Sequence, residues 1–414
     1  MWFTYIHYLC ISHFELYRMI KRFLCIILIF YISILHLSAQ QIQLSDSAKV
    51  SLLTSAPWEK EVYALFGHTA IRIQDPINQF DLVFNYGLFS FDSPNFMLRF
   101  IKGETDYMVG AENFNRYISE YKSRGVGITE QVFNLTQQEK QAVFDALAIN
   151  SLPENRVYRY NYFYDNCSTR PRDIIENNIH GTIHYTPTKE KQTYRDLVHE
   201  CVWVQPWVRF GIDLVIGADA DKKITDRQKD FLPLYLMSAY NNANIKSTDG
   251  NTRALLSEQN DILLSPKNDT IILIDPPLAI GCLLLVITLI ISFLSYKKNC
   301  ILLGKIFDTL LFITAGIAGS IIFFLMFFSV HPCTNPNWNI IWLNPLQLIF
   351  AFFFLIKFFS KYVYYYHFIN FVALILLLLA WFLIPQYLEL AFIPYILSLC
   401  VRSGTNVLQY KNRS

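Results

Sequence analysis

The chain has 414 residues, of which 53% are hydrophobic and only 16% carry a charge. Soluble globular proteins are closer to one quarter charged, so this composition argues against a wholly soluble protein. The net charge of +2, from 35 basic and 33 acidic residues, gives no electrostatic basis for nucleic acid as a partner. Eight cysteines in a chain of this length are too few for a scaffold held together by disulfides.

The N-terminal segment has the order of a secretory signal peptide. Lys21 and Arg22 precede an apolar core, and a site of small residues ends at Ala39. We predict a signal peptide at 19–39 and interpret residues 1–18 as an extension that arises from a misassigned start site. The alternative is an uncleaved anchor helix.

Apolar runs long enough to cross a membrane are confined to the last third of the chain. They cover residues 278–296, 309–330, 340–356, 368–384 and 385–401. About 20 apolar residues span the hydrocarbon core of a bilayer, so we expect five transmembrane helices. We therefore divide the chain after the signal peptide into an exported domain at 40–275, a membrane domain at 276–402 and a cytoplasmic tail at 403–414.

Basic residues between the apolar runs indicate the orientation. Those near the ends of the first, third and fifth runs are Lys297, Lys298, Lys305, Lys357, Lys361, Arg402, Lys411 and Arg413. The other two loops, at 331–339 and 385–387, contain neither lysine nor arginine. By the positive-inside rule the exported domain and the 331–339 loop face outwards. We expect a multi-pass protein of the bacterial inner membrane with its first domain in the periplasm.

Hydrophobic patterns predict mixed α and β structure in the exported domain. Residues 67–73 and 80–86 alternate in polarity around a turn at 75–78, which is typical of a β-hairpin. A capping-box pattern opens a predicted helix over 136–150. A later strand, predicted over 157–164, leads directly into another helix.

A cysteine lies at that junction between strand and helix. Pro171 has no N–H and suits the first helical turn, so we expect the helix to begin near Ser168 or Thr169 with Cys167 at its N-terminus. The unpaired N–H groups and partial positive charge of a helix start lower a thiol pKa, and the thiolate is the nucleophilic form. The alternative is a disulfide between Cys167 and Cys201, the other cysteine of the exported domain.

A nucleophilic cysteine needs a base, which is usually histidine. The candidates in the exported domain are His68, His180, His184 and His199. His68 precedes two small residues on its predicted strand, which leaves room for the imidazole. If the hairpin closes around 76–77, His68 lies opposite Asn85 or Tyr86. We therefore predict that Asn85 orients the imidazole, with Asp81 as the alternative. Any one histidine is more often structural than catalytic, which is the alternative for each of these four. No cysteine or histidine pair has zinc-ligand spacing, so we expect neither a metal nor a cofactor.

Three segments, in this order along the chain, resemble the periplasmic domain of the Lnb family, the Bacteroides-type lipoprotein N-acyltransferases. They are LFGHTA at 65–70, VFNYG at 83–87 and YDNCSTR at 164–170. The outer loop and the residues after it, at 331–345, resemble the five-helix membrane domain of the same family. The resemblance implies Cys167 as nucleophile and His68 as base.

The order of a histidine on a strand before a cysteine at a helix start is also similar to circularly permuted NlpC/P60-like folds. Lecithin:retinol acyltransferase belongs to that group. We therefore expect an α+β papain-like exported domain followed by an all-α bundle of five transmembrane helices.

The family resemblance implies acyl transfer at the outer face of the inner membrane. The Cys167 thiolate takes an acyl chain from a phospholipid as a thioester, and the chain then passes to the α-amine of a diacylglyceryl-cysteine lipoprotein. Backbone N–H groups at the helix start, including that of Cys167, would stabilise the oxyanion. The alternatives are a membrane-bound thiol lipid hydrolase, a cell-wall peptidase, or a non-enzymatic membrane scaffold with Cys167 in a disulfide.

The polar outer loop offers candidate ligands for a phospholipid headgroup or for the acceptor amine. We single out His331, Asn337 and Asn339 as possible substrate-binding residues. The alternative is a hydrated turn whose asparagines cap helices. Cys333 in the same loop either pairs with Cys201 or stays free.

Overall fold

The computed structural model describes residues 18–24, 27, 42–89, 94–247, 249–265, 274–297 and 300–411. The chain forms two compact units, Met1–Ser45 and Asp46–Ser414. Residues 1–17 of the predicted extension at 1–18 and most of the predicted signal peptide lie outside the described residues. The second unit holds both the exported domain and the helices of the membrane domain.

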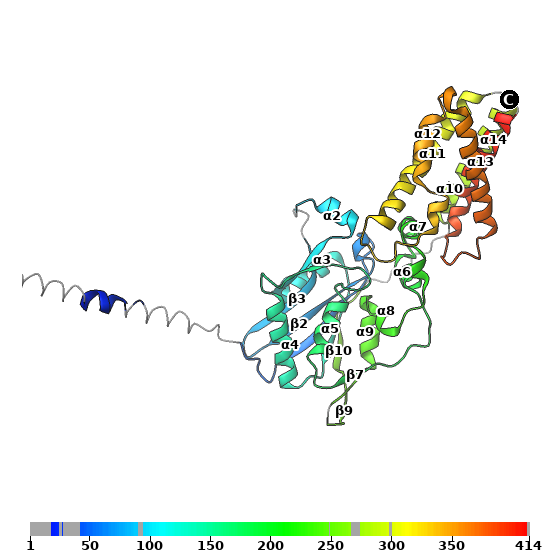
Figure 1. The fold of residues 1–414 in the computed structure, drawn as a ribbon. Coiled ribbons are helices and arrows are strands. Elements are labelled where there is room, and N and C mark those ends of the chain that lie inside the picture. The colour runs from blue at the N-terminus through cyan, green and yellow to red at the C-terminus, as the bar shows by residue number, and fades with distance from the viewer. Residues whose placement is uncertain are drawn as a thin grey trace, which may run out of the picture. The chain divides into compact units, whose positions relative to one another are not determined.

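Within the described residues, the exported domain is built on a seven-stranded antiparallel sheet with the order β10-β5-β1-β2-β3-β4-β6 (Figure 1). The strands are β1 (Lys49–Ser55), β2 (His68–Asp75), β3 (Phe80–Leu88), β4 (Asp106–Asn113), β5 (Ile128–Phe133), β6 (Val157–Arg159) and β10 (Leu256–Leu263). A smaller described sheet contains β7 (Thr182–His184), β8 (Asn244–Lys246) and β9 (Thr252–Ala254). β2 and β3 form the predicted hairpin, in which Ala70 lies opposite Asn85.

Helices connect and cover these strands. They are η1 (Val62–Ala64), α2 (Phe96–Lys102), α3 (Phe114–Arg124), α4 (Gln137–Asn150), α5 (Thr169–Asn177), α6 (Tyr194–Val202), α7 (Pro206–Val215), η2 (Ala218–Asp221), α8 (Asp226–Lys229) and α9 (Pro233–Asn241). The predicted capping box at the start of α4 is present, between Thr136 and Glu139. α5 begins at Thr169 with Ser168 as its N-cap, as predicted from the position of Pro171. The domain is therefore rich in both sheet and helix.

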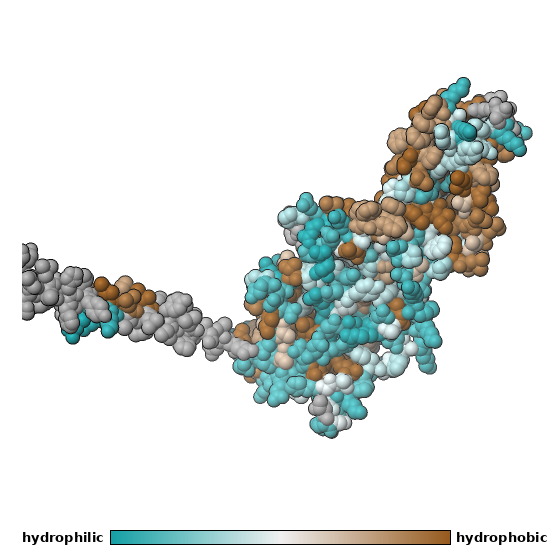
Figure 2. Space-filling view, viewed as in Figure 1, coloured by the Kyte–Doolittle hydropathy of each residue, from teal (hydrophilic) through white to brown (hydrophobic). Residues whose placement is uncertain are grey.

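The C-terminal region is helical and strongly apolar on its surface (Figure 2). Its elements are α10 (Pro276–Lys297), α11 (Ile301–Phe327), η3 (Trp338–Ile341), α12 (Pro345–Phe353), η4 (Lys357–Phe359), α13 (Ser360–Leu379), η5 (Leu390–Phe392) and α14 (Ile393–Lys411). In the described part of the chain, four helical segments are long and apolar enough to cross a membrane; they are Pro276–Lys297, Ile301–Phe327, Lys357–Leu379 and Leu390–Lys411. The third predicted run forms only a shorter apolar helix, Trp338–Phe353. Four of the five expected spans therefore have the necessary length.

The short helix α12 packs closely against α11 because two glycines of α11 face it. A Cβ added to Gly316 would lie 2.2 Å from the backbone nitrogen of Leu348, and one added to Gly319 would lie 2.3 Å from that of Asn344. Small residues are what allow membrane helices to approach so closely. α12 is thus an integral part of the helical bundle.

Candidate active site

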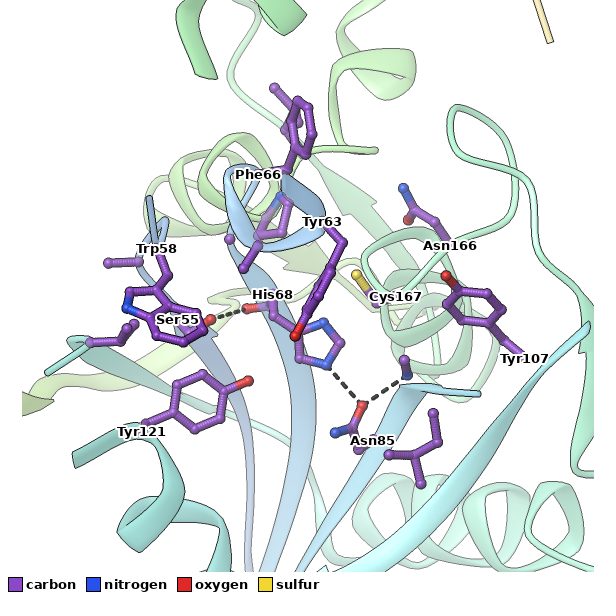
Figure 3. Close-up of a pocket in the computed structure, with 18 of the residues that line it drawn as sticks. Ser55, Trp58, Tyr63, Phe66, His68, Asn85, Tyr107, Tyr121, Asn166 and Cys167 are labelled. Atoms are coloured by element: carbon purple, nitrogen blue, oxygen red, sulfur yellow. Dashed lines mark hydrogen bonds between the residues drawn. The ribbon is translucent and has the colours of Figure 1, made fainter. Parts of the chain in front are cut away.

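His68 is fixed at the first position of β2 by a defined hydrogen-bond pattern. Its Nε2 lies 2.8 Å from Oδ1 of Asn85 on the neighbouring strand β3 (Figure 3). The same Oδ1 accepts the backbone N–H of Gly87 at 2.8 Å. Because a backbone N–H can only donate, the shared atom is the amide oxygen, and His68 must donate to it from Nε2. The other ring nitrogen, Nδ1, is left to face Cys167.

Gly87 lines the same site, although the sequence analysis gave it no role. A Cβ at Gly87 would lie 2.4 Å from Cε1 of His68, so any larger residue would displace the imidazole. The missing side chain lets the ring lie across β3 and reach Asn85. The signal was present in the sequence as a glycine two residues after Asn85 within a strand, where glycine often marks a close approach.

Cys167 lies directly before α5, and the surrounding side chains hold it there. Oδ1 of Asn166 accepts the N–H groups of Ser168 and Thr169 at 2.8 and 2.9 Å and so caps the helix. The amide of Asn166 also donates to the carbonyl of Phe231 at 2.9 Å. The hydroxyl of Thr69 donates to the backbone carbonyl of Cys167. Since Thr69 follows His68 on β2, this bond ties the cysteine to the strand that carries the histidine.

The thiol and the imidazole are hydrogen-bonded to each other and shift each other's pKa. Burial raises the pKa of Cys167, but the charge and hydrogen bond of His68 and backbone N–H groups outweigh it, so the pKa lies below the ordinary value. Burial lowers the pKa of His68, but Cys167 and the bond to Asn85 outweigh it, so the pKa lies above the ordinary value. Both shifts favour a thiolate beside an imidazolium, which is the arrangement of an activated cysteine nucleophile.

The pair opens into a cavity of about 280 Å³ with a largely aromatic lining (Figure 3). The aromatic residues include Trp58, Tyr63, Phe66, Phe89, Tyr107, Tyr160 and Tyr162. Cys167 itself is only 9% exposed, so its accessible surface is the part that faces this cavity. An apolar cavity with a few convergent polar groups is typical of a site for a largely apolar ligand.

Two family models cover most of the chain. The Lnb N-terminal periplasmic domain matches residues 38–200, and the Lnb transmembrane domain matches residues 267–413. The chain belongs to the Lnb family. It is accordingly a multi-pass membrane protein with a periplasmic domain, and membership of the Lnb family suggests an enzyme of lipoprotein N-acylation. Comparisons with curated proteins and with solved structures give no match.

In this Lnb protein, the contacts of the other three histidines and of the cysteines distinguish between the alternatives for the base and for a disulfide. Nε2 of His199 contacts the Asp213 carboxylate at 2.9 and 3.0 Å. His184 lies on the small sheet, 3.3 Å from the Thr182 hydroxyl, and the backbone N–H of His180 donates to Glu139. Cys167, Cys201 and Cys333 are free thiols, so neither alternative disulfide is formed. Of the four candidate histidines, His68 is the one that contacts Cys167.

Asp81, the alternative partner for His68, is committed elsewhere. Its carboxylate makes a bidentate ion pair with Arg72, with distances of 2.8 and 2.6 Å. Arg72 also contacts Glu130 at 2.9 Å, so the aspartate belongs to a charge network on the sheet. Of the two candidates, Asn85 is the residue that contacts the imidazole.

The three outer-loop residues lie away from the Cys167 cavity. Asn337 and Asn339 are 2% and 0% exposed, and both amides donate to backbone carbonyls at the end of α7. His331 is half-buried, with Nε2 2.9 Å from the carbonyl of Phe100 in α2. In the structure these three residues connect the periplasmic domain to the membrane helices. We had expected them to bind substrate.

Groups of three or more metal-ligating side chains are absent from the described residues. The thiol, the imidazole and the amide that contacts the imidazole all belong to protein side chains. The arrangement of these groups suits acyl chemistry at the thiol.

Proposed function

We propose that the protein is a lipoprotein N-acyltransferase in which Cys167 is the nucleophile, His68 the general base and Asn85 the residue that orients the base. The observation that carries the proposal is the contact of a buried, free thiol with an imidazole whose opposite nitrogen is held by Asn85. This triad lies in a periplasmic domain joined to membrane helices, where both lipid substrates are found. We also propose that the domain at 40–275 has a circularly permuted, papain-like fold.

In the first half-reaction, Nδ1 of His68 takes the thiol proton and the Cys167 thiolate attacks the carbonyl carbon of a phospholipid ester. The ester C–O bond breaks, His68 returns the proton to the leaving alkoxide, and a lysophospholipid departs. The acyl chain remains on Cys167 as a thioester. Asn85 keeps the proton on Nε2 throughout, so Nδ1 is always the atom that accepts and donates.

The oxyanion of the tetrahedral intermediate needs hydrogen-bond donors. Asn166 already takes the N–H groups of Ser168 and Thr169, which leaves the N–H of Cys167 as the donor at the helix start. We propose the Tyr107 hydroxyl as a second donor, because it lines the cavity on the side of Cys167 (Figure 3). Burial and the neighbouring Cys167 raise the pKa of Tyr107 to about 12, so this hydroxyl keeps its proton at neutral pH.

In the second half-reaction, the α-amine of a diacylglyceryl-modified cysteine attacks the thioester carbonyl. His68 accepts a proton from the amine, the C–S bond breaks, and the thiol is regenerated beside the base. The product is an N-acylated lipoprotein. A water molecule in place of the amine would release a free fatty acid, which is the outcome expected of a lipid hydrolase.

The membrane domain at 276–402 is proposed to cross the bilayer five times, with the tail at 403–414 in the cytoplasm. The short helix α12, which belongs to the third apolar run, brings the number of crossings from four to five. Phe353 at its end lines the same cavity as Ile301, at the start of α11, and Tyr410, near the end of α14. α12 therefore extends to those ends of α11 and α14 that we assign to the cytoplasmic side. The 3-10 helix η3, before α12, covers the part of the bilayer thickness that α12 is too short to cross.

The proposal is tested in a strain that depends on lipoprotein N-acylation. Wild type, Cys167→Ser, His68→Ala and the control His184→Ala are expressed, and lipoprotein N-termini are weighed by mass spectrometry. Wild type and His184→Ala are expected to give triacylated lipoproteins, and the other two variants to give diacylated ones. Triacylated product from Cys167→Ser would refute the mechanism, and free fatty acid without N-acylated product from the wild type would favour the hydrolase. A wild type that released peptide fragments from cell-wall material would favour the peptidase.

A further inference from the structure

Helix α2 exposes an unusual amount of apolar surface for a periplasmic helix. Met97 is 66% exposed, Leu98 54%, Phe100 50% and Ile101 46%. These four side chains make up most of a seven-residue helix. A contiguous apolar patch of this kind marks a contact with a membrane or with another protein.

The hydrogen bonds of α2 place it at the outer boundary of the membrane. The N–H of Val330 donates to the carbonyl of Lys102 at 2.8 Å, and His331 contacts the carbonyl of Phe100 at 2.9 Å. Both partners follow closely after Phe327, where the membrane-crossing helix α11 ends. α2 is thus fixed beside the outer end of a transmembrane span, which favours lipid over a soluble partner as its neighbour.

The charged residue in the middle of α2 is held back from this surface. The guanidinium of Arg99 pairs with the Asp106 carboxylate on β4, and Arg159 contacts the same carboxylate at 2.7 Å. The ion pair anchors α2 to the sheet and leaves the apolar side chains facing away from it. The result is a short amphipathic helix with its polar side tied to the protein, which suits an interfacial position.

A row of aromatic rings connects α2 with the catalytic cavity. The ring centroids of Phe100 and Phe96 are 6.0 Å apart, and those of Phe96 and Phe89 are 6.2 Å apart. Phe89 stacks on Tyr107 at 5.0 Å, and Tyr107 on Tyr160 at 4.1 Å. Because the last three of these residues line the cavity that holds Cys167, the apolar path runs from the membrane boundary to the thiol.

We propose that α2 inserts its apolar side chains into the outer leaflet and that the aromatic row from Phe100 to Tyr107 guides a lipid acyl chain into the Cys167 cavity. The insertion stands on the position and exposure of α2 alone, whereas the guidance of an acyl chain rests on the proposed function. The same lipid surface that binds α2 is the source of the acyl donor. α2 therefore shortens the distance over which an acyl chain must leave the bilayer.

The insertion is tested by photocrosslinking of the full-length protein in nanodiscs of phosphatidylethanolamine and phosphatidylglycerol. A benzophenone amino acid replaces Leu98, and the matched control replaces Ile149, which is 56% exposed on α4 of the sheet domain. Mass spectrometry is expected to find phospholipid adducts at position 98 and none at position 149. No lipid adduct at position 98, or equal adducts at both positions, would overturn the insertion.

The guidance is tested with the double variant Phe96→Ser/Phe100→Ser, which removes the two rings of the aromatic row that lie on α2, outside the Cys167 cavity. We expect its KM for phospholipid in vesicles to rise about tenfold or more at similar kcat. Alkylation of Cys167 by iodoacetamide should be unchanged, because this small reagent reaches the thiol through water. The matched control is Ile149→Ser/Leu152→Ser, which should behave as wild type.

The two halves of the proposal fail in distinguishable ways. Lipid adducts at position 98 together with an unchanged KM in the double variant would leave the insertion standing and refute the guidance. A wild type without acyltransferase activity would refute the proposed function and the guidance with it, and the crosslinking result would still decide the insertion. A double variant with altered alkylation of Cys167 would show damage to the site itself and would refute a role confined to lipid access.

Discussion

Replacing His68 by alanine should slow the alkylation of Cys167 at neutral pH. Without the imidazole, burial of the 9%-exposed thiol loses its main opposing influence, and the Cys167 pKa should rise to the ordinary 9.0 or above. A thiol with a pKa near 9 is only about 1% thiolate at pH 7. The more basic thiolate is intrinsically more nucleophilic, which offsets part of this loss. We therefore expect the alkylation rate at pH 7 to fall by about one order of magnitude or more.

The pH dependence follows from the directions of the two shifts. The lowered pKa of Cys167 means that thiolate is present below pH 9 and is lost as the pH falls through the shifted value. The raised pKa of His68 means that the imidazolium persists above pH 6.5 and is lost as the pH rises through its shifted value. Turnover should therefore follow a bell-shaped profile, with its ascending limb below pH 9 and its descending limb above pH 6.5.

The assay is iodoacetamide labelling of the full-length protein at a series of pH values, followed by mass spectrometry of the peptide that contains Cys167. Cys167→Ser provides the blank and His184→Ala the matched control. Cys201 is an internal reference, because burial and the neighbouring Glu200 raise its pKa to about 12 and keep it unreactive. Equal labelling rates for wild type and His68→Ala at pH 7, or a wild-type profile that rises only at pH 9 and above, would refute the reasoning.

Three further substitutions test other parts of the structure. Asn85→Ala should lower N-acylation turnover by about tenfold to a hundredfold. Because the bond to Asn85 raises the His68 pKa, the descending limb of the pH profile should also move to lower pH. An unchanged pH profile would contradict the orienting role. Asn339→Ala removes the hydrogen-bond partner of an α7 carbonyl and should cost about 1–3 kcal/mol of stability, measured by thermal unfolding. Alkylation of Cys167 should be unchanged. A raised KM at unchanged stability would instead indicate a role in substrate binding. Asp308→Asn leaves Arg402, which is 1% exposed, as an unpaired cation among the membrane helices. Stability in detergent, measured by thermal unfolding, should therefore fall by about 3–5 kcal/mol. The double replacement Asp308→Leu/Arg402→Met removes both charges and should cost less, and the opposite ranking would contradict this account.

Local patterns were enough to predict the neighbourhood of the site, although one register was wrong. A turn at 76–77 would put His68 opposite Asn85, whereas the observed last pair is Asp75 with Phe80, and Ala70 lies opposite Asn85. The turn is two residues longer, and Gln79 adopts a positive φ of 58° within it. A shift of two residues keeps every side chain on its face of the sheet, so His68 still reaches Asn85 diagonally. The register was wrong by two residues, an even number, so Asn85 is still the residue that His68 contacts.

The third apolar run shows what composition alone leaves out. Counting uncharged residues over 340–356 treats the run as one continuous segment, but Asn344 and Pro345 divide it. Asn344 and Gln347 form a capping box with Pro345 at the first helical position, so α12 starts only there. This N-terminal signal was present in the sequence and should outweigh the hydropathy of the residues before it.

The contacts of Asn337 and Asn339 could not have been predicted from local sequence, because their partners lie more than a hundred residues away. The carbonyls at the end of a helix have no partner within it and need one from elsewhere. At the end of α7 these partners are the two asparagine amides of the outer loop, at 2.8 and 2.9 Å. Asn339 also accepts the indole N–H of Trp342 at 2.9 Å, which fixes the orientation of its amide.

On the proposed function, the same contacts explain how a membrane enzyme can work with a fixed active site. Separating α7 from the outer loop would leave buried carbonyls unpaired, so the periplasmic domain is held against the membrane helices. α2 is attached to the same loop through Lys102 and Phe100. In the proposed topology, the hydrogen bonds at both contacts set the height of the Cys167 cavity above the bilayer. An enzyme whose thiol cannot approach the bilayer must bring the lipid to the thiol, which is the physical reason to place the exposed apolar side chains of α2 at the membrane boundary.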